Sequence, residues 1–159
     1  MMHLQSMRIR GFSVIELLFA IAILSVAISI VVISFSKLNS SKALKQSASL
    51  ITSVLNEARS LTLSSANGSQ YGVHFESSQV VLFKGASFSP ADPLNIPTEI
   101  NPLVGIGDVE LSGGGTNVVF RRLTGETAES GTIELFLKSS PETLLIITIN
   151  AAGLAEISL

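Results

Sequence analysis

The sequence of 159 residues contains no cysteine and no tryptophan, and only 14% of its residues are charged. Without cysteine, neither disulfides nor thiolate metal sites can form, so the fold has no covalent cross-links. The two histidines, His3 and His74, stand far apart in the sequence. Because transition-metal sites are usually built from several Cys or His ligands, we predict no such metal and no cofactor.

Patterns of catalytic residues are missing as well, so we do not predict an enzyme. The glycine triplet 113–115 is not followed by a lysine and a helix, which favours a flexible turn over a phosphate-binding loop. We interpret His74 as a residue of a strand and not as a ligand. Calcium would need clustered oxygen ligands, and the loose candidates Asp92, Asp108 and Glu110 do not predict a site.

Positive charge is scarce in the C-terminal part of the chain. The formal net charge is −2, and residues 66–159 contain ten acidic and four basic residues. A protein that binds nucleic acid must neutralise phosphates, so no nucleic-acid partner is expected. This argues against a second class of function, a nucleic-acid-binding protein that takes part in DNA uptake, since residues 151–159 also contain no basic residue.

One long apolar run is present, over residues 12–35. Its 24 residues include a single charged residue, Glu16, and neither glycine nor proline. At about 1.5 Å per residue, a helix of this length can cross a hydrocarbon core about 30 Å thick. Its serines can bond back to the preceding turn. We therefore predict a membrane-spanning helix over residues 12–35.

Two other interpretations of this run are weaker. A cleaved secretory signal has a shorter apolar core, followed by a small-residue cleavage site. This run is longer than such a core, and no clear cleavage site follows it. A plain membrane anchor leaves Gly11 and Glu16 unexplained. An ionised carboxylate inside a membrane costs at least about 2.5–3.5 kcal/mol on insertion scales. Cleavage between Gly11 and Phe12 would create an amine one helical turn from Glu16, and in an assembly the amine of a neighbouring subunit could pair with this carboxylate.

The residues Arg8, Arg10, Gly11, Phe12 and Glu16 together resemble the class III signal of type IV pilins and type II secretion pseudopilins. The resemblance implies a leader over residues 1–11, or a shorter one if translation starts at Met7. It also implies cleavage after Gly11 by a prepilin peptidase, N-methylation of Phe12, and an assembly role for Glu16. The implied location is the inner membrane, crossed once, with the N-terminus in the cytoplasm and the C-terminal domain outside it.

The segment that follows is predicted to continue the helix as an amphipathic half, residues 36–66. Its apolar residues recur at intervals of four and three, as on one face of a helix. The next position on this face is Thr62, where the apolar stripe weakens, and the turn signal Asn67-Gly68 follows. The stripe consists of Leu44, Ala48, Ile51, Leu55 and Ala58.

Residues 67–159 are predicted to form a β-rich domain. A hairpin is expected from Tyr71–Glu76 and Gln79–Lys84, and four of the five prolines predict an irregular loop over 86–103. One face of the strand Gly131–Lys138 is apolar, which suits a sheet covered on one side. The predicted fold class is α+β, one long helix packed on an antiparallel sheet, as in pilins. The other expected strands are Val109–Leu111, Asn117–Arg122, Leu144–Asn150 and Leu154–Leu159.

The C-terminal half resembles the GspH/FimT-type minor pseudopilin domain through Phe120, Arg121, Gly125, Gly131 and Gly153, and the pair Ala58-Arg59 resembles that family's helix end. The resemblance implies a structural subunit that assembles through its N-terminal helix. The implied filament is a type II secretion pseudopilus, and the alternative is a type IV pilus, with the chain as a minor subunit in either case. The implied partners are other pilins, the prepilin peptidase, the membrane and, in secretion, exported proteins. Of Arg121 and Arg122, strand alternation predicts one in solvent and one paired.

Overall fold

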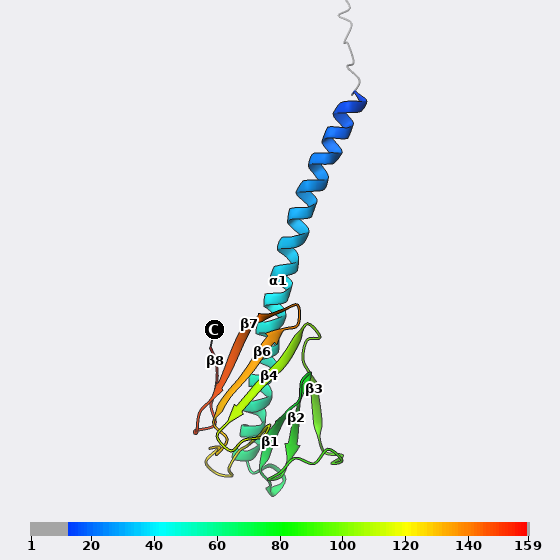
Figure 1. Ribbon diagram of the computed structural model, residues 1–159. Coiled ribbons are helices and arrows are strands. Elements are labelled where there is room, and N and C mark those ends of the chain that lie inside the picture. The colour runs from blue at the N-terminus through cyan, green and yellow to red at the C-terminus, as the bar shows by residue number, and fades with distance from the viewer. Residues whose placement is uncertain (1–12, 159) are drawn as a thin grey trace, which may run out of the picture. The chain divides into compact units, whose positions relative to one another are not determined.

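The computed structural model describes residues 13–158, except for the side chains of residues 30–38. The chain divides into two compact units, residues 1–38 and residues 39–159. Helix α1 (Val14–Leu63) contributes its first part to one unit and its last part to the other (Figure 1). We call residues 13–38 the stem and residues 39–158 the body.

In the described residues, the body contains two four-stranded sheets in which every strand pair is antiparallel. The strand orders are β3-β2-β1-β5 and β4-β6-β7-β8. The α+β class is thus confirmed, with two small sheets in place of the one sheet that was predicted. The strands are β1 (Tyr71–Phe75), β2 (Gln79–Lys84), β3 (Ile96–Glu99), β4 (Val104–Leu111), β5 (Asn117–Val119), β6 (Gly131–Leu137), β7 (Ser140–Ile149) and β8 (Ala155–Ser158).

The core of the body lies between the last turns of α1 and the sheets (Figure 1). The five apolar residues of the predicted stripe, from Leu44 to Ala58, are all buried there. Ile133, Leu135 and Leu137 of β6 are buried as well, while the residues between them are partly exposed, as the alternation predicted. Burial of these side chains stabilises the fold by about 25 cal/mol per Å² of apolar surface removed from water.

Thr62 extends the buried stripe by one turn instead of ending it. Its side chain is fully buried, and its hydroxyl donates to the carbonyl oxygen of Ala58 at 2.8 Å. The hydroxyl oxygen of Thr62 also accepts a hydrogen bond from the backbone N–H of Tyr71 at 2.9 Å. Because both bonds are made inside the core, this threonine ties the end of α1 to the start of β1 without leaving a polar group unsatisfied.

The predicted loop 86–103 contains a strand, β3, in spite of its prolines. Pro97 lies opposite Val81 of β2 in this edge strand. A proline has no N–H to donate, which an edge strand tolerates because its outer side makes no ladder bonds. The loop prediction was therefore right for residues 86–95 and 100–103, which form no helix or strand, and wrong for Ile96–Glu99.

Strand β4 starts at Val104, five residues before its predicted start. The prediction missed this part because glycines interrupt the alternation of apolar and polar residues. Gly105 lies opposite Phe136 of β6, and a Cβ atom added at Gly105 would come within 2.6 Å of the Phe136 ring. The ring thus fills the space that a side chain would take, which compensates for a glycine inside a strand. In addition, β7 begins at Ser140 and not Leu144, and β5 ends at Val119 and not Arg122.

Candidate functional site

The described stem begins with the first turn of α1. The backbone N–H of Leu17 donates to the carbonyl oxygen of Ser13 at 3.1 Å, and Glu16 lies exposed in this turn. The predicted leader, residues 1–11, and the cleavage and methylation positions Gly11 and Phe12 lie outside the described residues. Within the described residues, no helix combines the length and the apolar character needed to cross a membrane.

The surface of the described stem is almost entirely apolar. Its large apolar side chains are exposed by between 52% (Ile21) and 76% (Val14). Ser25 and Ser29 bond back to the carbonyl oxygens of Ala22 and Ser25, both at 2.8 Å, as predicted. A soluble monomer rarely exposes so continuous an apolar patch, so the stem requires a partner or an apolar environment. The exposed set is Val14, Ile15, Leu17, Leu18, Phe19, Ile21, Ile23, Leu24, Val26 and Ile28.

Glu16 is the single charged residue between positions 13 and 29. No cation of the described chain lies within ion-pair distance of it, the one such pair being His74–Glu76 in the body. The positive end of the helix dipole favours a carboxylate in the first turn, but this is worth only about 0.3–1 kcal/mol at an exposed site. Glu16 is therefore an exposed carboxylate with no charged partner in the described part of the chain.

At the other end of α1, Arg59 joins the helix to the loop that follows β5. Its Nε donates to the carbonyl oxygen of Gly125 at 3.1 Å. The loop closes on itself because the N–H of Gly125 donates to the carbonyl oxygen of Arg121 at 2.9 Å. Gly125 has φ +67°, in the left-handed region where glycine pays no steric cost.

Gly153, in the turn between β7 and β8, packs against this loop. It has φ +76°, and a Cβ atom added there would overlap the carbonyl oxygen of Gly125 and lie 3.1 Å from the Phe120 ring. The structure thus brings together Arg59, Phe120, Gly125 and Gly153, four of the residues singled out in the sequence. We call this set the 125 anchor; it is a packing centre that joins the helix, the loop and the last hairpin.

The other singled-out residues lie elsewhere. Gly131 packs against the backbone of Glu110 at the start of β6. Arg121 and Arg122 are both exposed, and neither forms an ion pair with a described residue, so the prediction that one is paired is wrong. The physical reason is that β5 ends at Val119, so strand alternation no longer applies at these positions.

Sequence analysis missed Glu129. One of its carboxylate oxygens accepts hydrogen bonds from the N–H of Val119 at 3.2 Å and from the hydroxyl of Thr127 at 2.8 Å. The glutamate thereby satisfies a donor on the outer edge of β5. No pattern in the sequence marks it, because the bond depends on how the 120–129 loop folds back along the strand.

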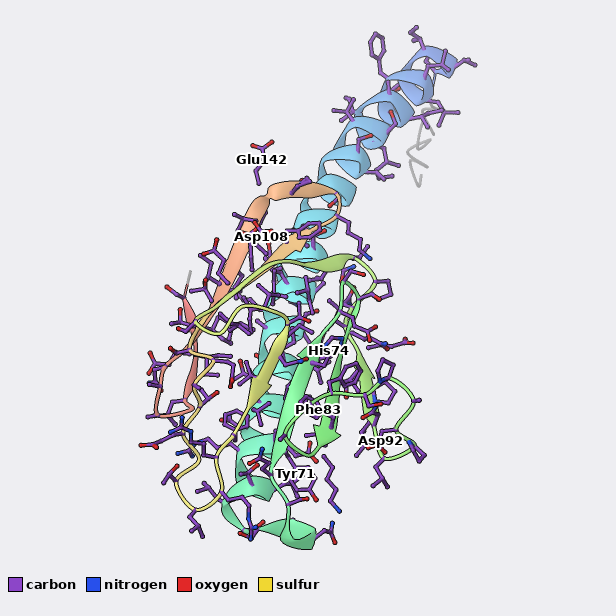
Figure 2. The ribbon with its side chains drawn as sticks, turned by 60° about the horizontal axis from the view of Figure 1, so that its bottom comes forward. Tyr71, His74, Phe83, Asp92, Asp108 and Glu142 are labelled. Atoms are coloured by element: carbon purple, nitrogen blue, oxygen red, sulfur yellow. The ribbon has the colours of Figure 1, made fainter. Side chains whose placement is uncertain are left out.

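His74 lies in β1, as interpreted, and its ring is held on two sides. It stacks on the ring of Phe88 with centroids 3.9 Å apart, and its Nδ1 lies 2.6 Å from Oδ1 of Asn117. Figure 2 shows Asp92 and Asp108 well apart on the body. Within the described residues, no group of three or more potential metal ligands lies together.

Comparison with known proteins agrees with these observations. Residues 6–32 match the prokaryotic N-terminal methylation motif. The structure resembles the type IV minor pilin FimU of Pseudomonas aeruginosa with a TM-score of 0.55 and 15% sequence identity, over 73% of this chain and 93% of that one. The chain has a pilin-like fold behind a pilin-type N-terminal signal. Among the curated proteins, none matches the chain.

The matched motif covers the candidate site at the start of the chain. The motif includes Gly11, Phe12 and Glu16 and extends through the exposed apolar residues of the stem. It implies processing by a prepilin peptidase and assembly with other pilins. What this arrangement offers chemically is binding: an apolar helix surface for packing and one carboxylate for pairing.

Proposed function

We propose that the chain is a minor pseudopilin, a structural subunit of a type II secretion pseudopilus. In this proposal a prepilin peptidase cuts after Gly11, Phe12 is N-methylated, and the stem holds the subunit in the inner membrane before assembly. The N-terminus faces the cytoplasm and the body lies outside it. Other pseudopilins and exported proteins are the partners.

One observation carries the proposal: an exposed apolar helix surface with a lone carboxylate in its first turn. Packing the stems of many subunits side by side removes that surface from water, at about 25 cal/mol per Å². Glu16 then meets the methylated amine of Phe12 from a neighbouring subunit. The GspH/FimT-like residues of the 125 anchor support a minor subunit.

A minor pilin of a type IV pilus is the second candidate, and the likeness to the minor pilin FimU favours it. Deleting the coding sequence separates the two. Loss of exported proteins from the medium with normal surface pili supports the secretion role, whereas loss of pili with normal export supports the pilus role.

Mass spectrometry of the N-terminus tests what both candidates share. The protein is purified from the membranes of its own host, and a chain that begins at methylated Phe12 is expected. Gly11→Val should leave the leader attached, because a prepilin peptidase is expected to need a small residue at this position. Gln5→Val, in the leader but outside the matched motif, serves as the control and should be processed normally. An intact leader in the unaltered protein would contradict the proposal.

A further inference from the structure

The two sheets have four edge strands, β3, β5, β4 and β8, and three of them are blocked at one position each. Pro97 removes a donor from β3, and Glu129 bonds the N–H of Val119 on β5. On β4, the N–H of Ile106 donates to the carbonyl oxygen of Ser77 at 3.0 Å. An unpaired edge is a template for another strand, and proteins usually block such edges. Among the described residues, none blocks the last edge, β8, in this way.

The outward backbone groups of β8 belong to Ala155 and Ile157. The turn before β8 is closed by a bond from the N–H of Asn150 to the carbonyl oxygen of Leu154 at 3.0 Å. Hydrogen-bonded and non-bonded pairs alternate in an antiparallel ladder, so Glu156 bonds to Thr148 of β7 and its two neighbours point away from β7. No described residue of the chain pairs with this side of β8.

The side chains around this edge suit a partner strand. Ile157 is 42% exposed, and it lines a groove of about 220 Å³ with Leu145 of β7 and with Lys45 and Ser49 of α1. Lys45 is exposed and forms no ion pair with a described residue. The groove thus offers apolar side chains and the cation of Lys45 next to Ile157 of the β8 edge.

We propose that the β8 edge binds an extended segment of a different filament subunit, which adds to the sheet as a further strand. The segment bonds to the backbone of Ala155 and Ile157. It places an apolar side chain over the groove and a carboxylate beside Lys45. Main-chain bonds supply affinity in such strand addition, and alternate side chains supply specificity. The identity of the occupant as a filament subunit rests on the proposed function.

A second copy of the chain fits this edge poorly. The antiparallel register that uses the outward groups of both Ala155 and Ile157 in each copy puts Glu156 directly opposite Glu156 of the other copy. Like charges that face each other across strands are destabilising. A segment from a different subunit, with a neutral or basic residue opposite Glu156, avoids this repulsion.

Photo-crosslinking in the host tests the proposal on the full chain. A benzophenone-bearing amino acid replaces Ile157 and, as the matched control, Ile96, which is 55% exposed on the blocked edge of β3. We expect the probe at position 157 to attach to an extended segment of another filament subunit and the probe at 96 to give no such product. A product between two copies of this chain, or no product at 157, would overturn the proposal.

Two further variants separate backbone pairing from general damage. Ala155→Pro removes an outward N–H and should lower the crosslinking yield by up to about tenfold, the effect of one backbone hydrogen bond. Ala155→Val keeps the N–H and should retain the yield. Lys45→Glu lies on the surface, leaves the core intact and should also reduce the product. Unchanged yields in both Ala155→Pro and Lys45→Glu would overturn the proposal.

The same cells report on the proposed function. Processing at Phe12 and the presence of the chain in sheared filaments are measured in parallel. If the chain is processed and incorporated but position 157 gives no product, the strand-addition proposal alone fails. If the chain is neither processed nor incorporated, the proposed function fails, and a product with a protein outside the filament would overturn the assigned occupant.

Discussion

The Nε of Arg59 donates a hydrogen bond to the carbonyl oxygen of Gly125, 66 residues further along the chain and 3.1 Å away. Arg59 is half-buried at this point, and its neighbour Leu63 also packs against Gly125. The contact holds the last turns of α1 against the loop after β5, and Gly153 packs against the same carbonyl oxygen of Gly125. Helix, loop and final hairpin therefore depend on one small region.

Replacing Arg59 should destabilise the body. Arg59→Ala leaves the carbonyl oxygen of Gly125 without its partner, and we expect a loss of about 1–2 kcal/mol in the free energy of unfolding. Urea unfolding of the full chain in detergent measures this. Glu57→Ala, an exposed position on the same stretch of helix, is the control and should change stability by less than about 0.5 kcal/mol. Equal effects of the two substitutions would contradict a specific role for Arg59.

Gly153→Ala should be more damaging than Gly114→Ala, although both glycines have positive φ. At Gly114 (φ +68°) no atom lies within 4 Å of an added Cβ, so only the backbone strain of about 1–2 kcal/mol applies. At Gly153 the new methyl group also overlaps the carbonyl oxygen of Gly125 and crowds Phe120. We expect a difference of at least about 1 kcal/mol between the two variants, measured by the same unfolding experiment. Comparable losses would show that packing at Gly153 is looser than described.

Much of this fold could be predicted from the sequence because its strongest signals are periodic. The spacing of Leu44, Ile51 and Ala58 gave the buried helix face, and the alternation in β6 gave the core side of its strand. What failed depended on contacts that are distant in sequence. The predicted strand was shorter than β4 because the glycines of β4 are covered by Phe136 of another strand, a contact that the local sequence does not record. The division into two sheets likewise follows from pairings, which no local pattern records.

The candidate site also combines local features that the sequence could predict with features that depend on distant contacts. The motif at the start of the chain is local, and the likeness to pilins that it implied agrees with the methylation motif and with the fold. The positions Gly11 and Phe12 themselves stay predictions. By contrast, the hydrogen bonds of Glu129 and the pairing state of Arg121 and Arg122 arise only when the 120–129 loop folds. Sequence patterns named Gly125 and Gly153 but could not show that they touch.

Thr62→Val and Thr52→Val form a second matched pair on α1. Valine at position 62 removes the hydroxyl that accepts the N–H of Tyr71, which leaves a buried donor unsatisfied at a cost of about 1–3 kcal/mol. The hydroxyl of Thr52 is buried without a hydrogen-bond partner, so its removal should be neutral or stabilising. The thermal unfolding temperature should fall for Thr62→Val and should stay the same or rise for Thr52→Val. A loss at position 52 as large as that at 62 would contradict these assignments.

Glu16→Gln tests the assembly role of the stem with the smallest change in shape. The substitution removes the charge but keeps the size of the side chain, so membrane insertion should be unchanged or easier, because a neutral group costs less in hydrocarbon than a carboxylate. Incorporation into filaments should fall about tenfold or more, since a hydrogen bond to a charged partner is worth about 1.5–3 kcal/mol. Glu57→Gln, exposed on the body part of the same helix, should incorporate normally. Quantitative immunoblots of membranes and of sheared filaments measure both quantities. Equal incorporation of Glu16→Gln and the unaltered chain would mean that Glu16 has no pairing role, and the helix dipole alone would then account for a carboxylate in the first turn.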